Sequence, residues 1–426
     1  MSAFKLVLLF LVVVGFGQAN DWPVTDHLAL ALVALLLGAF VWSRVSLGGV
    51  AVTRETATDR AQVGQTLVER IEVRNAGRLG KLWLEVNDYS TLPNHQVGRV
   101  VHVRGRGVAR WQVETRCVRR GRFRVGPLVL RSGDPLGLFP ARLAVPGAHE
   151  LTVYPAALDL RGFPMPAGLL AGGKALERRT PFVTPSVAGV RDYVPGDAFS
   201  RISWAATARL GRMMVKEFDL DPTADVWLVL DLDRRVHTHA TRPLDLPPAD
   251  EPWPVEAWLD STEEYAVTIA ASFARRFLEQ GRNVGLIATG AHHEVIPADR
   301  SDRQYVKILE SLAVVRADGQ LPLAEALVAA ARRFSRQSST IVITPSTEEA
   351  WVAALSEITG RRVRASAVIV EPATFGAAPA SLLVVSNLAA AGVPTHLVKY
   401  GDNIAAALSS VSGAGVGAGT RGTSRG

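Results

Sequence analysis

The sequence has one cysteine, Cys117, in 426 residues. A single thiol excludes an internal disulfide framework and any metal site built from cysteines. The sequence also lacks a Walker A motif, a dinucleotide-binding glycine fingerprint and a Gly-x-Ser-x-Gly nucleophile elbow. These absences remove the common nucleotide-binding and serine-hydrolase motifs, and we expect that the chain is not an enzyme.

The chain also lacks a large excess of charge of one sign, because its formal net charge is only +7. Arginines are dense between Arg99 and Arg131, but there they alternate with valine, which is typical of a strand with one solvated face. No RNA-binding aromatic motif accompanies them. We therefore expect attraction to an anionic membrane leaflet and no nucleic-acid partner.

The hydrophobic share of 48% is ordinary, so membrane residence has to come from local segments. Two apolar segments, Phe4–Phe16 and Leu28–Trp42, lie near the N-terminus. Each is shorter than the roughly 20 residues of a membrane span, but flanking residues extend the usable length. Trp22 and Trp42 stand where interfacial aromatic residues belong. The sequence therefore predicts two transmembrane helices.

The charges around these segments predict their orientation. The loop between them carries Asp21 and Asp26 and no basic residue, whereas Arg44 and Arg54 follow the second segment. By the positive-inside rule the loop lies outside and the rest of the chain lies in the cytoplasm, as in a multi-pass protein of the cell membrane. In the alternative, the first segment is a signal peptide cleaved after Ala19. Both interpretations leave the soluble part in the cytoplasm.

From Val52 to about Pro155 the pattern changes to a period of two. Leu67, Ile71 and Val73 alternate with charged residues, and Gly/Asn/Asp turns separate the runs. No helical stretch of useful length interrupts them. This region is predicted to be a small antiparallel β-sandwich.

The C-terminal half alternates strands and helices, which predicts an α/β domain with a mostly parallel sheet and helices on both faces. A Pro/Gly/Ala-rich stretch before it is predicted to be a linker over the surface, and a Gly/Ser-rich tail is predicted to be disordered. The predicted organisation is: transmembrane helices, 1–48; β-sandwich, 49–155; linker, 156–186; α/β domain, 187–411; and tail, 412–426.

The start of the α/β domain has a distinctive local pattern. Pro195-Gly196 predicts a turn and Asp197 a helix N-cap. A short amphipathic helix is predicted from four apolar residues at helical spacing: Phe199, Ile202, Ala206 and Leu210. Gly211 is placed to end it in a left-handed conformation. Strands are predicted at 213–218 and 225–233, the second of them buried on both faces.

This stretch resembles a known bacterial family. Its pattern is Arg-x-Tyr-x-Pro-Gly-Asp at 191–197, Arg-Ile-x-Trp at 201–204, Ala-Arg at 208–209, Val-Lys-Glu-Phe at 215–218 and then the strand at 225–233, which ends in Asp. The pattern resembles the family called domain of unknown function 58; residues 119–127 and 134–139 also resemble its β segment. The resemblance implies two transmembrane helices, a β-rich segment and a domain similar to the von Willebrand factor type A fold. It also implies a MoxR-type AAA+ ATPase as partner.

A degenerate metal site is one interpretation of Asp231 and Asp233. In von Willebrand A domains this position holds Asp-x-Ser-x-Ser, which binds a divalent cation such as Mg²⁺ or Mn²⁺. Here Arg235 stands where the third oxygen ligand is needed, and Thr344-Pro345-Ser346 replaces a later acidic ligand. A cation beside Arg235 would be repelled unless that side chain swings away. In the alternative, Asp231 caps the next turn or pairs with an arginine, and no metal or other cofactor binds.

Charged and aromatic residues gather in the matching stretch, and they have two interpretations. They are Arg191, Tyr193, Asp197, Arg201, Trp204 and Arg209. The first interpretation is a partner-docking or anion-binding surface with the arginines as bidentate donors. The second is a structural lock of Arg–Asp pairs that fastens the turn to the sheet edge. The lock explains the charges but not Trp204.

These observations predict a membrane-anchored, cytoplasmic protein-interaction module that works with a MoxR-type AAA+ ATPase. Its partner is expected to dock on the strand-end loops around 231–235 and 289–293. One alternative is a divalent-metal-dependent binding domain that uses Asp231 and Asp233. Another is an envelope-associated hydrolase, for which the sequence offers only Asp231 with His292 or His293 as an acid/base pair. His237 and His239 are expected to be loop residues. The oligomeric state stays open.

Overall fold

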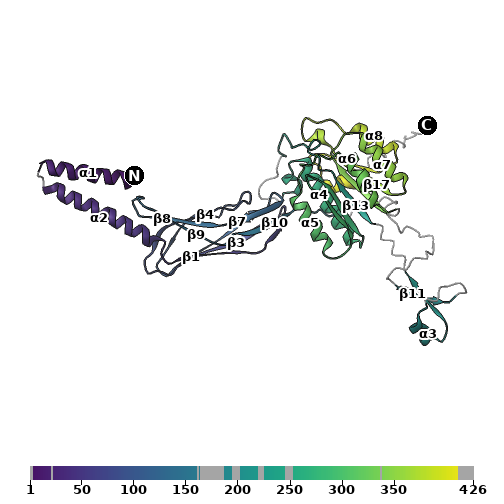
Figure 1. The fold of residues 1–426 in the computed structure, drawn as a ribbon, viewed down its shortest axis with the longest axis horizontal. Coiled ribbons are helices and arrows are strands. Elements are labelled where there is room, and N and C mark those ends of the chain that lie inside the picture. The colour runs from purple at the N-terminus through teal and green to yellow at the C-terminus, as the bar shows by residue number, and fades with distance from the viewer. Residues whose placement is uncertain are drawn as a thin grey trace, which may run out of the picture. The chain divides into compact units, whose positions relative to one another are not determined.

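The structure is a computed structural model that describes residues 3–20, 23–160, 163, 187–193, 202–218, 225–244, 253–335 and 338–410. These residues form a mixed α/β fold in two compact units (Figure 1). Unit 1 comprises Met1–Ala156, Pro252–Trp258 and Leu309–Val314, and unit 2 comprises Ala157–Glu251, Leu259–Ile308 and Val315–Gly426.

Unit 1 begins with two apolar helices, α1 (Ala3–Asn20) and α2 (Pro23–Ser46). Among the residues that the structure describes, α2 alone is long and apolar enough to cross a membrane, and the apolar part of α1 is shorter. A helix near the N-terminus with this composition suggests membrane anchoring, and the second span stays a prediction. Asp21 and Trp22, used in the topology argument, lie outside the described residues.

The rest of unit 1 is built from strands. They are β1 (Val50–Thr56), β2 (Arg60–Gln62), β3 (Thr66–Asn75), β4 (Lys81–Asp88), β5 (Arg99–Val103), β6 (Val108–Arg116), β7 (Gly121–Val125), β8 (Leu128–Gly133), β9 (Pro140–Val145) and β10 (His149–Tyr154). Their sheets have the orders β1-β3-β6, β5-β4-β8-β9 and β2-β10-β7. Every pairing is antiparallel except that of β10 with β2.

One hydrophobic core joins the first two of these sheets. Ile71 and Val73 of β3 pack in the same buried cluster as Leu84 of β4 and Leu130 of β8. The period of two along β3 therefore buries alternate side chains, as its sequence predicts. Glu69 is a charged residue at one of these core positions, and its side chain is 0% exposed.

Unit 2 is built around a six-stranded sheet of order β15-β14-β13-β16-β17-β18, in which β15 alone runs antiparallel to its neighbour. Its strands are β13 (Val226–Leu230), β14 (Val284–Thr289), β15 (His293–Asp299), β16 (Ser339–Thr344), β17 (Arg364–Val370) and β18 (Thr395–Val398). Its helices are α4 (Thr262–Glu279), α6 (Leu323–Ala330), α7 (Ala350–Gly360), α8 (Leu382–Ala390) and α9 (Ile404–Ser409), with 3-10 turns at Ala331–Arg333 and Pro372–Thr374. Helix α5 (Gln304–Val314) begins in unit 2, and its residues Leu309–Val314 belong to unit 1.

The two faces of this sheet are covered by different helices (Figure 1). Trp227 and Val229 of β13 belong to the core cluster that holds the buried side chains of α6, α7 and α8. Helix α4 also packs against β13 but contributes no residue to that cluster. Because side chains alternate along a strand, α4 lies on the opposite face, beside Leu228 and Leu230. All five residues of β13 are therefore buried.

Two predictions about this half of the chain need correction. Apolar residues at helical spacing, among them Tyr265 and Phe273, predict a helix at 254–280. Helix α4 begins only at Thr262, because Ser261 is its N-cap and accepts from Glu264 N at 3.3 Å. Val255–Trp258, which precedes it, is a separate 3-10 turn.

The second correction concerns the predicted surface linker, which begins as a packed segment. Leu160 and Phe163 are buried, and the Phe163 ring lies 5.0 Å from that of Phe273 in α4. The abundance of Pro, Gly and Ala obscured these two apolar anchors. Residues 161–162, 164–186 and the predicted tail lie outside the described residues.

Candidate functional site

The stretch that resembles a known family folds as two strands around a short helix. Strand β11 (Val187–Asp192) pairs antiparallel with β12 (Met214–Phe218), and α3 (Trp204–Leu210) lies between them in sequence. The C-cap prediction is confirmed, since Gly211 has φ +67° and its N–H bonds to Thr207 O. In this left-handed region any other residue is strained.

The predicted start of this helix is wrong. Ile202 forms an isolated β-bridge with Val215, and the neighbouring Ser203 N donates to Met214 O at 2.8 Å. These backbone bonds hold Ile202 in an extended conformation, so the helix begins at Trp204 with Ser203 as its N-cap. Asp197, the predicted N-cap, lies outside the described residues.

The predicted docking residues take different places in this segment. Arg191 lies in β11 opposite Val215, and Tyr193 N donates to Met213 O at 2.9 Å. Arg201 lies outside the described residues, as Asp197 does. Trp204 and Arg209 lie on α3, which has no buried residue, and Trp204 is 66% exposed.

An ion pair that the sequence did not predict joins the last residue of β11 to a residue that precedes β12. Arg212 Nε lies 3.1 Å from Asp192 Oδ1, and both side chains are more than half exposed, at 64% and 61%. A pair this exposed contributes at most about 1 kcal/mol. The sequence pattern places the expected Arg–Asp pairs before residue 210, and only the β11–β12 register brings Arg212 next to Asp192.

Asp231 lies directly after β13, at the carboxyl end of a central strand. Its side chain is fully buried and accepts from Thr344 Oγ1 at 2.6 Å and from Asp233 N at 3.1 Å. Burial raises the pKa of Asp231 to about 6, against the opposing effect of these two hydrogen bonds. The carboxylate fastens the turn after β13 to the end of β16, which agrees with the capping interpretation.

Asp233 and Arg235 form a second closed arrangement at the same edge. Arg235 Nε lies 3.1 Å from both carboxylate oxygens of Asp233, whose side chain is 2% exposed. Burial would raise the pKa of Asp233, but hydrogen bonds from the side chain and backbone of Arg235 outweigh it and lower the pKa. The guanidinium is therefore turned towards the carboxylates, not away from them.

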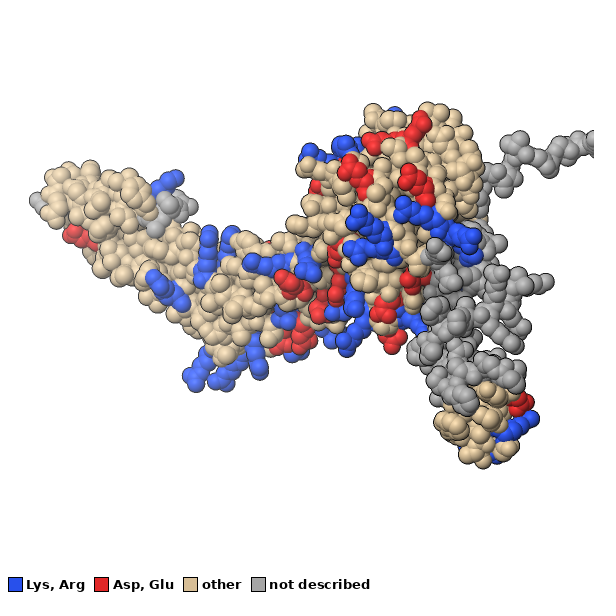
Figure 2. Space-filling model, turned by 45° about the vertical axis from the view of Figure 1, so that its right-hand side comes forward, with Lys and Arg blue, Asp and Glu red and all other residues tan. Residues whose placement is uncertain are grey.

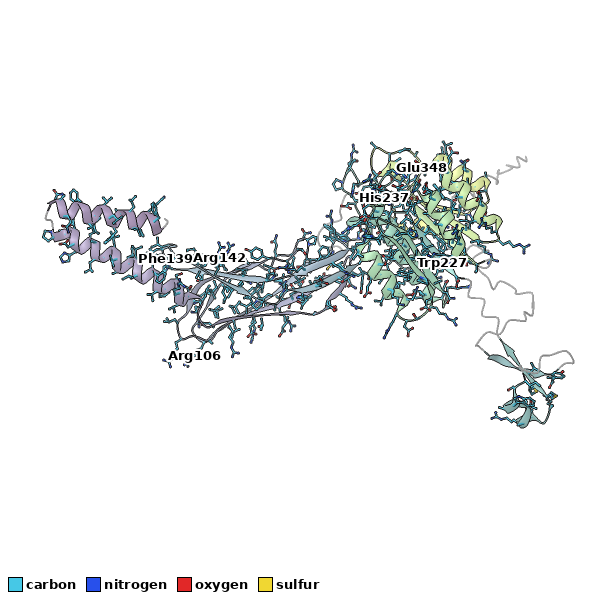
Figure 3. All side chains as sticks on the ribbon, viewed as in Figure 1. Arg106, Phe139, Arg142, Trp227, His237 and Glu348 are labelled. Carbon is cyan, nitrogen blue, oxygen red and sulfur yellow. The ribbon has the colours of Figure 1, made fainter. Side chains whose placement is uncertain are left out.

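The groups around Asp231 and Asp233 form a hydrogen-bonded network that closes the strand end. His237, labelled in Figure 3, has Nε2 2.9 Å from Asp231 O and Nδ1 3.0 Å from Thr262 Oγ1. Thr344 Oγ1 accepts from Ser346 N at 2.8 Å. Within the described part of the chain, no group of three or more His, Cys, Asp or Glu side chains is placed to hold a metal ion.

Residues 318–319 cover the carboxyl end of β14, which neighbours β13 in the sheet. Gly319 N donates to Leu232 O at 3.0 Å, and a Cβ at Gly319 would lie 2.1 Å from Thr289 O. Only glycine permits this approach. Asp318 Oδ1 accepts from Ala291 N at 2.8 Å. His292 and His293 are exposed. The histidine that contacts Asp231 is His237, through the backbone oxygen of Asp231, and the hydrolase alternative did not use it.

Unit 1 holds a buried ionic cluster that the sequence analysis missed. Arg54 Nη2 lies 2.7 Å from Glu69 Oε2, and Arg54 Nη1 lies 3.0 Å from Asp88 Oδ1. His95 Nε2 lies 3.0 Å from Glu69 Oε2 and 3.1 Å from Asp88 Oδ2. None of the four side chains is more than 7% exposed. We call these residues the Arg54 cluster.

The cations in the Arg54 cluster reverse the effect of burial on its acids. Burial raises the pKa of Glu69 and of Asp88, but hydrogen bonds from His95 and Arg54 outweigh it and bring both pKa values to about 2. Burial lowers the pKa of His95, and its contacts with Asp88 and Glu69 raise it overall. With His95 protonated, two cations face two anions, so the cluster is neutral.

Nothing local in the sequence marks this cluster. Its members come from β1, β3, β4 and the connection after β4, and only the three-dimensional pairing of those elements brings them together. One indication of the cluster was available in the sequence. Glu69 is a charged residue at a position where the period of two predicts a core side chain.

Comparison with known proteins agrees with the family resemblance. The profile of the family "Protein of unknown function DUF58" matches residues 189–244. The uncharacterized protein YeaD of Bacillus subtilis (strain 168) is 24% identical over 251 residues, which are 58% of this chain. The match covers 56% of YeaD, so the chain spans about half the length of that relative. Both matches support a relationship with the DUF58 family.

Similarity to solved structures is weak. The pilus adhesin SpaC from Lactobacillus rhamnosus GG is 11% identical with a TM-score of 0.33, and the match covers 45% of this chain and 30% of SpaC. The CARDB domain of a Pyrococcus furiosus protein, solved with di-metal ions, is 12% identical with a TM-score of 0.19, over 24% of this chain and 91% of that domain. Scores this low carry no argument about function.

Proposed function

We propose that the chain is a membrane-anchored, cytoplasmic protein-interaction module that docks a MoxR-type AAA+ ATPase through the segment Val187–Phe218. In this proposal both apolar helices cross the membrane and unit 2 is a divergent von Willebrand A-like domain. The AAA+ partner is the one that the family resemblance implies.

The observation that carries the proposal is the exposure of Trp204. A tryptophan that is 66% exposed on a helix without buried residues contributes little to the fold. Leu210 on the same helix is 50% exposed, and Met213, which is separated from the end of the helix by two residues, is 39% exposed. Exposed aromatic and apolar residues flanked by arginine are typical of protein-interaction hot spots. These residues also lie within the part of the chain that matches the family profile.

The strand ends of unit 2 have a supporting role in this proposal. Asp231 and Asp233 are buried and bonded, so a partner at this edge meets the exposed Arg234, His292 and Glu348 instead. The acids then hold the loops in shape, which is a structural role and not a catalytic one.

Binding of the purified ATPase to the full chain in detergent tests the proposal. Replacement of a hot-spot tryptophan commonly costs at least about 2 kcal/mol, so we expect Trp204→Ala to weaken binding about 30-fold. Val328→Ala is the matched control, because Val328 is also an exposed apolar residue, 58% exposed on α6. Equal binding by the wild type and Trp204→Ala, or no binding by the wild type with nucleotide and Mg²⁺ present, would contradict the proposal.

A further inference from the structure

The loops at one end of unit 1 are tied to the C-terminal end of α2. The buried Lys81 donates from Nζ to Val45 O at 2.7 Å, and Ala76 N donates to Gly49 O at 2.8 Å. Asn75 Nδ2 donates to Leu79 O at 2.8 Å and to Arg104 O at 3.1 Å. The connections at 76–80 and 104–107 therefore form one surface with the end of α2.

The loop between β8 and β9 joins the same surface and packs along α2. The rings of Phe40 and Phe139 meet edge to face at 5.6 Å. Leu138 belongs to the buried cluster of Leu32 and Ala39. At 1.5 Å per residue, the 24 residues of α2 span roughly 36 Å, more than the hydrocarbon thickness of about 30 Å. A membrane around α2 thus reaches this loop.

Large apolar side chains surround a hollow on this surface. The hollow has a volume of about 420 Å³, and its lining includes Trp42 at the end of α2. The other large apolar residues in the lining that are exposed are Val45 (43% exposed), Leu79 (59%), Leu82 (61%), Trp83 (46%) and Leu136 (52%). Contiguous exposed apolar residues of this size mark a membrane or partner interface.

The exposed charged side chains of this surface have one sign. They are Arg44 of α2, Arg78, Arg104 and Arg106 of the loops, and Arg142 of β9. Arg106 and Arg142 are labelled in Figure 3, and Figure 2 shows basic side chains over this end of unit 1. The acid of these loops, Asp134, is 3% exposed, and its carboxylate accepts from Leu136 N at 2.9 Å and Phe139 N at 2.6 Å. The surface is therefore apolar and cationic.

We propose that this end of unit 1 is a binding site for anionic phospholipid of the bilayer that holds α2. The arginines bind the phosphate groups, and the hollow beside Trp42 takes the apolar part of the lipid. Two observations favour lipid over an acidic protein: α2 itself lines the hollow, and Trp42 lies near the C-terminal end of α2, where interfacial aromatic residues belong in a membrane helix. The inference rests on the proposed membrane anchoring.

Lipid titration of the full chain in detergent, followed by native mass spectrometry, tests the site. We expect phosphatidylglycerol to bind tighter than phosphatidylcholine. The variant Arg78→Gln/Arg104→Gln/Arg106→Gln should lose about fivefold in phosphatidylglycerol affinity per arginine removed. The matched control is Arg70→Gln/Arg99→Gln/Arg122→Gln, which removes three exposed arginines further along the strands. Equal affinity for the two lipids, or an equal loss in the control, would overturn the proposal.

A second measurement tests the hollow itself. In vesicles containing phosphatidylglycerol, a fluorophore on Leu82→Cys should be quenched by brominated acyl chains, and one on Gln112→Cys should not. Both variants carry Cys117→Ala. Equal quenching at the two positions would overturn the proposal.

Alkaline carbonate extraction of native membranes separates this inference from the proposed function. Release of the chain would contradict the anchoring. Retention of the chain with no preference for phosphatidylglycerol would contradict the lipid site alone.

Discussion

Glu69 in unit 1 and Asp231 in unit 2 are both carboxylates with fully buried side chains, yet their pKa values differ widely: about 2 for Glu69 and about 6 for Asp231. Both accept short hydrogen bonds. Glu69 receives them from Arg54 and Thr56, and it also faces His95. Asp231 receives them from the neutral Thr344 hydroxyl and the Asp233 amide.

The difference shows what each kind of donor can do for a buried charge. Burial raises the pKa of both carboxyl groups, because it disfavours the charged form. Neutral donors reduce that effect at Asp231 without reversing it, whereas the cations around Glu69 reverse it. The Arg54 cluster is thus a compensated ionic network, and Asp231 is a buried acid whose negative charge is only partly offset.

The largest expected loss of stability is that of Arg54→Ala, which removes the arginine that offsets the buried charges of unit 1. Arg54→Ala leaves Glu69 and Asp88 buried with His95 as their remaining cationic neighbour, and loss of one partner from a buried pair costs about 3–5 kcal/mol. We expect faster hydrogen exchange of the β3 and β6 amides in the full chain, because this measurement reports the opening of unit 1 alone. The exchange of β13 should be unchanged.

The control for this variant is Arg110→Ala. Arg110 pairs with Glu72 on the same sheet, but its side chain is 72% exposed, so solvent screens the pair and its loss should change the exchange of β3 far less than Arg54→Ala does. If Arg54→Ala and Arg110→Ala had equal effects on β3, the Arg54 cluster would not be a compensated network.

Asp231→Asn should raise the stability of unit 2, by less than Arg54→Ala lowers that of unit 1. At pH 8 Asp231 is ionised although its pKa is about 6, and the amide removes that buried charge. The amide oxygen can still accept from Asp233 N, and the Thr344 hydroxyl can accept from the new amide group. The expected gain in stability of β13 and β16 is about 1–3 kcal/mol, measured by hydrogen exchange at pH 8.

The matched variant Asp233→Asn should lower stability instead, because it removes the carboxylate that pairs with Arg235. A loss of protection of β13 in Asp231→Asn at pH 8 would mean that the ionised carboxylate stabilises the strand end.

The two units should also respond to acid in opposite directions. The pKa of Asp231 is raised on folding from 3.8 to about 6, so its contribution is greatest in acid and is lost as the pH rises between these values. Unit 2 should therefore gain stability from pH 6 to pH 4. The pKa of Glu69 is lowered from 4.5 to about 2, so unit 1 should lose stability as the pH falls between these values. Each proton changes the free energy of unfolding by at most about 1.4 kcal/mol per pH unit.

Hydrogen exchange corrected for intrinsic rates measures both slopes in one chain. The gain of unit 2 in acid should disappear in Asp231→Asn. If it persisted in that variant, another group would be responsible, and the contrast between the two carboxylates would fail.

The sequence predicted the position of Asp231 at a strand end, but it did not predict the hydrogen bonds that Asp231 makes there. The apolar run of β13 and the strand–helix alternation placed Asp231 at a strand end, because a strand buried on both faces has a recognisable composition. The bond from Thr344, 113 residues away, depends on strand order, which local patterns do not specify. The Arg54 cluster was missed for the same reason, and Ile202 was placed in a helix because helical spacing cannot report its bridge to Val215.

The smallest expected effect on stability is that of added divalent cations. Mg²⁺ binding at Asp231 would have to displace the hydrogen bonds from Thr344 and Asp233 N, and Arg235 already neutralises Asp233. Because a ligand that binds only the native state must stabilise it, we expect Mg²⁺ or Mn²⁺ to leave the melting temperature of the full chain unchanged. Arg235→Ser frees Asp233 and supplies a hydroxyl, so any response to Mg²⁺ should be confined to that variant. A cation-dependent rise in the wild type that Asp231→Asn abolishes would instead favour the metal-dependent binding domain, and the buried charge of Asp231 would then be compensated by an ion, as that of Glu69 is by Arg54.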